Sequence, residues 1–430
     1  MPPRWPLSTS SASSTVLRRS LRPTTGARVF ALVFCAALTA LSPAAFAQAA
    51  PDGGPADAGA PSAEDQAMLK EIEAAAAAPA AGAAAPTEAT APAAAEKGKG
   101  SSFFSNVFNP AMSVNGLFLG SFSSEKNPPA SDAQSGLAIQ EIEVQFLANV
   151  DPYLSANVIL SLPGGQGIGL EEGYLALTPQ PLGIALRAGK LKVPFGRENM
   201  THTHAFPFVD KSLIGTAVFG EEGLGEVGVE GTYLMPVPWY LLVTASVLDG
   251  DNQLAFKSPT GRHLAGFGAL KNVFDLTDDA TAELGASYVA GKNADLLVSQ
   301  VAGAHLVLKW KPASDSTASS AVVTAEGMYS HVPAAASSAT EADTWGFYSY
   351  AQWQLAQRWY LGGRYEYLRP AAVDPQAGMR ESAILVFAPT EFSAFRLQFN
   401  VHQPGGSAPQ VFEAFLQVNF TLGAHPAHSY

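Results

Sequence analysis

The sequence predicts an all-β fold in which about 16 antiparallel strands form a transmembrane barrel. Apolar and polar residues alternate with a period of two through most of the chain after residue 103. The alternating segments are about 10 residues long, the length that crosses a bilayer at a tilt, whereas strands of soluble proteins are usually about 5–6 residues long. Hydrophobic residues make up 47% of the chain, yet its body contains no apolar run long enough for a membrane-spanning helix.

The overall composition agrees with this fold class. Charged residues account for 14% of the chain, where about a quarter is usual in soluble proteins. A weakly charged chain with 39 glycines suits a barrel whose outer face meets lipid. The net charge is −12, so we expect outer-membrane lipid and small solutes as partners and no nucleic acid.

The N-terminus has the organisation of an export signal. Residues 1–28 are basic and rich in serine, and residues 29–41 form an apolar core that is too short to span a bilayer. Ala45-Phe46-Ala47 then offers a small-x-small cleavage pattern. We therefore expect a signal peptide over residues 1–47, with a start downstream of Met1 left open by the length of the leader.

Removal of this signal changes the charge and the thiol content of the chain. Five of the 25 basic residues and no acidic residue precede the cleavage site, so 20 basic residues remain against 37 acidic ones, a net charge of −17. Cys35, the only cysteine, lies in the removed core. A lipoprotein signal at Cys35 is disfavoured because Phe34 occupies a position that requires a small residue. The mature chain is thus expected to have no disulfide and no cysteine-based metal site.

A linker is expected to follow the signal. Residues 48–102 consist mainly of alanine, proline and glycine, a composition that buries too little apolar surface to fold. A short helix over residues 63–78 is the exception, but its apolar side covers a single turn, which is too short for a coiled coil. We interpret it as a transient helix in a disordered linker, with an envelope-contact helix as the alternative.

The barrel itself is predicted over residues 103–423, with a tail at 424–430. In the last strand, Phe412, Leu416 and Phe420 are apolar and face lipid, while Gln417 and Asn419 between them face the lumen. The predicted strands cover residues 112–122, 138–150, 153–162, 169–178, 183–192, 226–235, 239–249, 263–274, 280–290, 300–311, 321–331, 344–356, 358–369, 379–388, 392–402 and 410–422. Short turns are expected at the periplasmic rim and long loops at the extracellular rim.

Aromatic residues gather near the predicted strand ends. Interfacial girdles of tryptophan and tyrosine are typical of membrane barrels, although aromatic residues also have a general preference for strands. The residues concerned are Trp239, Tyr240, Trp345, Trp353, Trp359, Tyr360, Tyr365 and Tyr367.

The segment from Gly189 to Leu224 is the most distinctive local sequence. A strand ends in Lys192-Val193-Pro194-Phe195-Gly196, and a long loop then returns to a glycine-rich strand start. Over roughly residues 105–423 the chain resembles the phosphate-selective porin O/P family, including an early Asn115-Gly116 strand and a final Asn419–Leu422 strand. The resemblance implies a trimeric outer-membrane channel of 16 strands with a long loop folded into its pore. This chain lacks the runs of arginine and lysine that phosphate-specific members place at the constriction.

Alternation also predicts which charged side chains line the lumen. The basic candidates for an anion preference on the wall are Arg187, Arg364, Arg380 and Arg396. The acidic pore-lining candidates are Glu141, Glu143, Glu230 and Glu283. Because the basic set lies mostly late in the chain and the acidic set mostly early, we expect opposed walls and a transverse field. The alternative is that these residues are solvated lumen side chains without a selective role.

Three further basic residues flank or occupy the long loop. Periodicity places Lys190 and Lys192 toward lipid or its interface, whereas their position in the family motif favours a role at the start of the loop. Arg197 lies within the loop and is the strongest candidate there for an anion preference.

His202 and His204 form an i, i+2 pair in the same loop. Imidazoles suit zinc or copper, but spacing supplies no third ligand. We therefore predict no metal site and no cofactor, and expect the histidines to be hydrogen-bonded while Phe206 and Phe208 pack against the inner wall.

Together these features predict a passive diffusion channel for small hydrophilic solutes, with anions such as phosphate among them, in the bacterial outer membrane. The chain has no Gly-x-Ser-x-Gly, phosphate-binding glycine loop or His-Glu-x-x-His, so no enzymatic activity is expected. The alternative is a non-conducting structural barrel that anchors the cell envelope through its N-terminal extension.

Overall fold

The computed structural model describes residues 110–125, 135–164, 167–178, 180–252, 254–257, 263–312, 319–334, 343–369, 377–405 and 408–423. The predicted signal peptide, linker, short helix and C-terminal tail lie outside these residues.

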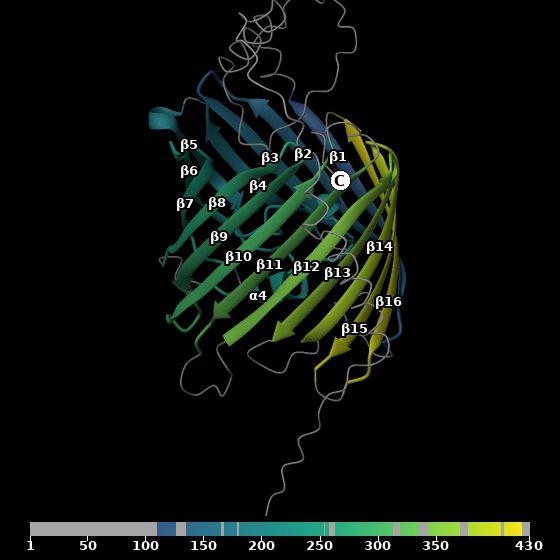
Figure 1. The fold of residues 1–430 in the computed structure, drawn as a ribbon. Coiled ribbons are helices and arrows are strands. Elements are labelled where there is room, and N and C mark those ends of the chain that lie inside the picture. Colours follow the sequence, from purple (N-terminus) through teal and green to yellow (C-terminus); the bar gives the residue numbers. More distant parts are fainter. Residues whose placement is uncertain are drawn as a thin grey trace, which may run out of the picture. The chain divides into compact units, whose positions relative to one another are not determined.

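The described residues form a closed antiparallel barrel of 16 strands, as the sequence predicted (Figure 1). Each strand pairs with its neighbours in the chain, and β1 pairs with β16, so the sheet has no free edge. The strands are β1 (Ala111–Ser123), β2 (Gly136–Asn149), β3 (Leu154–Pro163), β4 (Gly169–Leu177), β5 (Ile184–Lys192), β6 (Gly225–Leu234), β7 (Tyr240–Leu248), β8 (Ala265–Thr277), β9 (Ala280–Lys292), β10 (Val298–Trp310), β11 (Ser320–His331), β12 (Asp343–Ala356), β13 (Trp359–Arg369), β14 (Gly378–Thr390), β15 (Ser393–Pro404) and β16 (Val411–Gly423). The predicted strand ends agree with these to within about three residues.

The two faces of the barrel differ as alternation requires. On β16, Phe412 and Leu416 are 51% and 54% exposed on the outside, whereas Gln417 is fully buried on the inside. Trp345, Trp353 and Trp359 are also exposed. A closed barrel that exposes so much apolar surface is stable in lipid rather than in water. No helix within the described residues has the length and apolarity to cross a bilayer.

The chain between β5 and β6 folds into the barrel instead of extending from its rim. It contains a short 3₁₀ turn, η3 (Thr203–Ala205), and one helix, α4 (Leu213–Phe219). Ser212 caps this helix by accepting a hydrogen bond from the Gly215 N–H, and the chain leaves it at Gly220. α4 lies inside the ring of strands, against β11, β12 and β13 (Figure 1). We call residues 193–224 the inner loop.

The inner loop supplies seven of the 17 buried residues of a hydrophobic core that fills part of the lumen. Phe195, Ile214 and Phe219 are buried against wall residues such as Phe267 and Met328. A second cluster buries Phe208 and Val209 of the loop, and Phe206 is also buried, as predicted for the two phenylalanines. Burying each such side chain contributes about 1.5–3 kcal/mol, so this core alone holds the loop firmly inside the barrel.

Asn199 of the loop and Glu326 of β11 fix the backbone at the base of the inner loop. Asn199 donates to the carbonyls of Val193 (2.7 Å) and Leu224 (3.1 Å) and accepts from the Leu224 N–H, which ties the two ends together. Gly196 has a φ of 62°, and a Cβ at this position would collide with the Glu326 carboxylate. This explains the glycine of the Val-Pro-Phe-Gly motif, because Glu326 accepts hydrogen bonds from the next two backbone N–H groups.

Candidate functional site

The first contact of the inner loop with the wall is an arginine cluster around Asp210. Asp210 lies 2.7 Å from Arg364 and 3.0 Å from Arg380, and Gln398 and Asn400 donate to the same carboxylate. Arg396 donates to the loop carbonyls of Phe206 (2.9 Å) and His204 (3.2 Å). We call Asp210, Arg364, Arg380 and Arg396 the arginine anchor.

The arginine anchor is electrically compensated as well as buried. Arg364 and Arg396 are 3% and 2% exposed, and Glu366 takes a further ion pair from Arg380 at 2.6 Å. Although burial opposes its ionisation, the guanidinium groups of Arg364 and Arg380 hold the pKa of Asp210 below its usual range. The three arginines lie on the lumen side, as alternation predicted. They do not present free charge to a passage, however, because the inner loop covers them.

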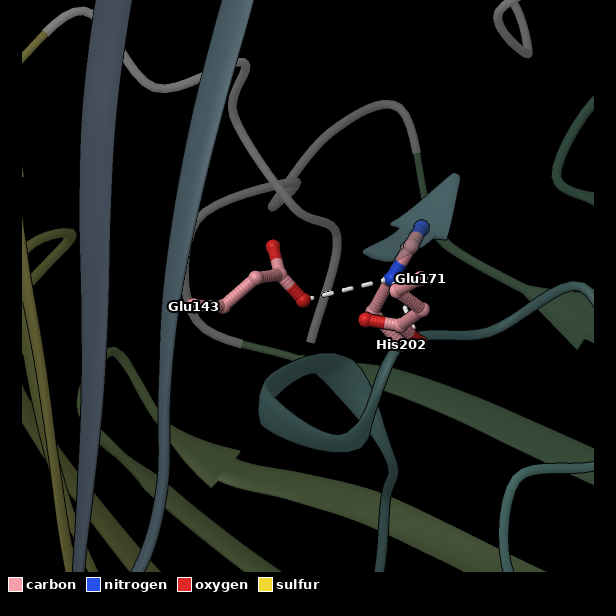
Figure 2. Close-up of side chains that lie close together, drawn as sticks. All are labelled: Glu143, Glu171 and His202. Atoms are coloured by element: carbon pink, nitrogen blue, oxygen red, sulfur yellow. Dashed lines mark ion pairs between the residues drawn. The ribbon is translucent and has the colours of Figure 1, made fainter. Parts of the chain in front are cut away.

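The second contact of the loop is a set of carboxylates on β2 and β4, shown in part in Figure 2. Glu143 Oε2 lies 3.2 Å from His202 Nδ1 and 3.3 Å from His204 Nδ1. Glu171 Oε1 lies 3.3 Å from His202 Nδ1, and Glu172 Oε2 lies 3.7 Å from the Nε2 atom of the same ring. We call Glu143, Glu171, Glu172, His202 and His204 the acidic anchor.

Three carboxylates around one imidazole decide the charge state of His202. Burial disfavours the charged ring, but Glu143, Glu171 and Glu172 outweigh it and raise the pKa of His202 well above its usual value. Glu143 and Glu171 also offer oxygen atoms close enough to His202 to share a metal ion, with all three ligand atoms within 4.8 Å of one another. These are the further ligands that the sequence spacing could not supply.

A β-bulge explains why both glutamates of the Glu171-Glu172 pair face inward. The register between β3 and β4 shifts between Ile159 and Leu160, which pair with Glu172 and Leu170 respectively. Glu171 is the extra residue, so it escapes strict alternation. Lys192 pairs with this inward Glu171 and is buried. The periodicity-based prediction that Lys192 points toward lipid is therefore wrong, because the bulge and the inward turn of the chain after β5 bring the two side chains together.

The remaining predicted site residues are distributed along the walls. Arg187 pairs with Glu230 at 2.7 Å, and Glu141 accepts a hydrogen bond from Ser161. Lys190 donates to the Leu170 carbonyl at a more exposed place than Lys192. Glu141 also lies close enough to Glu143 and Glu171 of the acidic anchor to interact with them electrostatically.

A third group lies on β8–β10, near the start of the inner loop. Glu283 lies 3.2 Å from both Lys271 Nζ and His305 Nε2. Arg197 is close enough to interact electrostatically with Glu283 and Lys309. No ion pair of the Arg197 side chain is found within the described residues. We call Arg197, Lys271, Lys309 and Glu283 the basic patch; sequence reasoning identified Arg197 and Glu283 and missed both lysines.

Barrel closure changes the predicted arrangement of charge. The acidic anchor uses β2 and β4, and the arginine anchor uses β13–β15, so only β16 and β1 separate the two walls on one side. The predicted opposition therefore does not hold for Glu141 and Glu143 on β2, because closure between β1 and β16 brings them near the arginines of β13–β15. Glu230 on β6, in contrast, lies eight strands from Arg380 on β14. The basic patch on β8–β10 lies several strands away from both.

Comparison with known proteins agrees with the fold. No protein-family model matches the chain. An uncharacterised protein of Aquifex aeolicus (strain VF5) is 27% identical over 341 residues, which cover 69% of this chain and 70% of that protein.

Solved structures extend the comparison to three dimensions. The outer-membrane channel DcaP of Acinetobacter baumannii superposes with a TM-score of 0.51 at 10% identity, covering 73% of this chain and 96% of that one. A mutant Rh. blastica porin has a TM-score of 0.47 at 12% identity, covering 72% and 100%. The chain thus has the 16-stranded barrel fold of outer-membrane porins, and its exposed apolar belt is that of a barrel embedded in a membrane.

Proposed function

We propose that the chain forms a passive diffusion channel for small hydrophilic solutes. The observation that carries the proposal is the inner loop, which is fixed inside a closed barrel by a hydrophobic core and by polar contacts on two walls. A loop that is fixed in this way narrows the lumen of the barrel to a constant width and does not move to close it. Polar side chains fill the inner positions of β15 and β16, where they are buried against the inner loop and hold it to the wall.

A preference for small anions, phosphate among them, is the finer part of the proposal. Arg364 and Arg380 are paired with carboxylates, and Arg396 is buried against loop carbonyls. The acidic anchor carries an excess of negative charge, so neither anchor offers positive charge to a solute. The basic patch has three cationic side chains and one carboxylate, Glu283, and so keeps a positive excess. Arg197 thus remains our candidate for the main selectivity residue, while Arg364, Arg380 and Arg396 hold the loop in place.

Recordings from the purified protein in a planar bilayer test both parts. A diffusion channel gives stepwise, ohmic conductance, and a salt gradient gives a reversal potential of the sign expected for anions. Absence of conductance steps from folded protein would overturn the channel and favour the non-conducting structural barrel. A cation preference would overturn only the selectivity.

The resemblance to the phosphate-selective porin O/P family supports a homotrimer, which chemical cross-linking in detergent tests directly. A single cross-linked band at three times the chain mass is the expected result. We also propose export by the signal peptide, so that N-terminal sequencing of the mature protein begins at Gln48.

A further inference from the structure

We infer that the acidic anchor is a zinc site, in which Glu143, Glu171 and His202 bind one Zn²⁺ ion and His204 lies beside them as a fourth candidate ligand. The site would join β2 and β4 to the inner loop. Such a metal is structural and does not depend on whether the barrel conducts, so the inference goes beyond the proposed function.

The distances between the side-chain atoms fit a shared metal ion. Zinc is bound tetrahedrally by nitrogen and oxygen ligands at about 2.0–2.2 Å, which places neighbouring ligand atoms about 3.3–3.5 Å apart. His202 Nδ1 lies 3.2 Å from Glu143 Oε2 and 3.3 Å from Glu171 Oε1. His204 Nδ1 lies 3.3 Å from Glu143 Oε2. Atoms of three side chains from three segments therefore approach the spacing of one ligand set, and His204 contacts this set through Glu143.

A buried carboxylate oxygen without a hydrogen bond, Glu143 Oε2, also supports a bound zinc ion. Glu143 is only 3% exposed, and its Oε2 makes no hydrogen bond within the described residues, although two imidazole nitrogens lie within 3.3 Å. Contacts this short without hydrogen-bond geometry leave a buried carboxylate oxygen unsatisfied, which is costly. A metal ion between these atoms satisfies the oxygen and the nitrogens together.

Glu171 is also equipped to bind a metal while it keeps its other partner. Lys192 holds Oε1, whereas Oε2 is buried and makes no hydrogen bond. Oε1 therefore lies close to both the lysine and His202 Nδ1, and the carboxylate has a second oxygen, Oε2, without a hydrogen bond that can also bind the metal. The lysine fixes the orientation of the carboxylate, as outer partners of metal ligands commonly do.

The excess of negative charge around the acidic anchor favours a bound cation, and the ligand atoms present there favour zinc over other metal ions. Glu141, Glu143, Glu171 and Glu172 converge here, and Lys192 is the one permanently charged cation paired with them in the described residues. Imidazole with carboxylate suits zinc, whereas calcium and magnesium prefer oxygen ligands alone. Glu172 lies on the Nε2 side of His202, where a carboxylate retains the ring proton and leaves Nδ1 for the metal.

Direct zinc binding by the full-length, untagged protein in detergent tests the inference. After EDTA treatment and buffer exchange, competition with a chromophoric chelator measures the affinity, and elemental analysis gives the stoichiometry. We expect one Zn²⁺ per chain in the wild type and at least tenfold weaker binding in Glu143→Gln and His202→Ala. The matched control is His305→Ala, because His305 lies on β10, away from the acidic anchor, and makes its ion pair with Glu283. This variant should bind zinc as the wild type does.

Two readouts keep the test decisive if a variant folds poorly. Heat-modifiable gel migration reports whether each variant forms the barrel, and only folded variants are compared. Co²⁺ bound to the wild type should give the visible absorption of a tetrahedral site with nitrogen and oxygen ligands. Substoichiometric zinc in the wild type, wild-type affinity in folded Glu143→Gln and His202→Ala, or a purely octahedral Co²⁺ spectrum would each overturn the zinc site.

Discussion

The two anchors hold the same loop to neighbouring walls by opposite means. In the arginine anchor, guanidinium groups that stay charged at all physiological pH values surround one loop carboxylate, Asp210, and also donate to loop carbonyls. In the acidic anchor the wall supplies the negative charges and the loop supplies imidazoles, whose charge depends on what they bind.

The two anchors therefore differ in charge compensation: side chains of the protein neutralise most of the charge in the arginine anchor, whereas the acidic anchor requires a bound cation. In the arginine anchor, Asp210 and Glu366 balance Arg364 and Arg380. Arg396 donates to the carbonyls of Phe206 and His204 and to Gln417. The acidic anchor keeps an excess of carboxylates, and two of its buried oxygens, Glu143 Oε2 and Glu171 Oε2, make no hydrogen bond within the described residues. The position of the loop is therefore fixed by the chain alone at one wall, and by a bound cation at the other.

The largest effect is expected from Asp210→Asn. This change leaves Arg364 and Arg380 buried with one carboxylate fewer, and breaking a buried ion pair on one side costs about 3–5 kcal/mol. Urea denaturation in detergent should show this loss, and single-channel recordings should show an enlarged and noisier conductance as the loop loosens. Asp278→Asn, which alters an exposed turn carboxylate, is the control. Equal stability of the two variants would mean that the arginine anchor does not hold the loop.

Removal of the metal should have the next largest effect. A ligand present at about 100 times its Kd stabilises the folded state by about 2.7 kcal/mol, so EDTA should lower the Tm of zinc-loaded wild type by an amount of that order. The Tm of His202→Ala should not respond to EDTA, while Asp210→Asn should respond as the wild type does. If EDTA shifts all three proteins equally, its action does not involve the acidic anchor.

The strands could be predicted from the sequence because each barrel strand faces lipid on one side. On β15, Phe395, Leu397 and Phe399 are exposed while Arg396 and Gln398 are buried, as alternation required. The rule weakens on β8–β11, where inner positions such as Phe267 and Val301 are apolar because the inner loop packs on them. In a strand that is apolar on both faces, alternation does not distinguish the inner face from the outer one. The inward orientation of Lys271 and Lys309 therefore could not be predicted.

The acidic anchor could be predicted only in part. Alternation identified Glu143, and the spacing of His202 and His204 suggested a ligand pair. The partnership with Glu171 depends on the bulge in β4 and on the path of the inner loop, neither of which has a local sequence signal. The pairing of Asp210 with Arg364 joins residues far apart in the chain, so it too needed the closed barrel.

A smaller effect is expected where the loop meets neither anchor, at Arg197. Arg197→Gln removes one charge from the basic patch, and a unit charge near a wet surface acts with about 1 kcal/mol at 4 Å, roughly fivefold in an equilibrium. The ratio of anion to cation permeability, measured from reversal potentials, should fall by up to that factor. Arg358→Gln, at an exposed turn, serves as the control. An unchanged ratio in Arg197→Gln would remove Arg197 from the selectivity mechanism and leave the channel proposal intact.

A pH-dependent effect is expected from Glu198, which joins the loop to itself through Ser212. Its carboxylate accepts hydrogen bonds from the Ser212 N–H and hydroxyl, and faces Glu326 and Arg364 on the wall and Lys211 on the loop. Burial, together with the charge of Glu326, raises the pKa of Glu198 from 4.5 to about 7. The folded state therefore holds this proton more tightly than the unfolded chain does.

A raised carboxyl pKa fixes the direction of the pH dependence. The stabilisation is complete below about pH 4.5 and is lost as the pH rises through about 7. Wild-type Tm should decrease between pH 5 and pH 8 by a few degrees more than the Tm of Glu198→Gln, since about 2–4 °C corresponds to each kcal/mol in a domain of 150–250 residues. Glu391→Gln, at an exposed turn, should keep the wild-type slope. If Tm decreases with pH at the same rate in wild type and Glu198→Gln, Glu198 does not titrate in this range. The acidic anchor, through its response to EDTA, would then be the loop contact that depends on solution conditions.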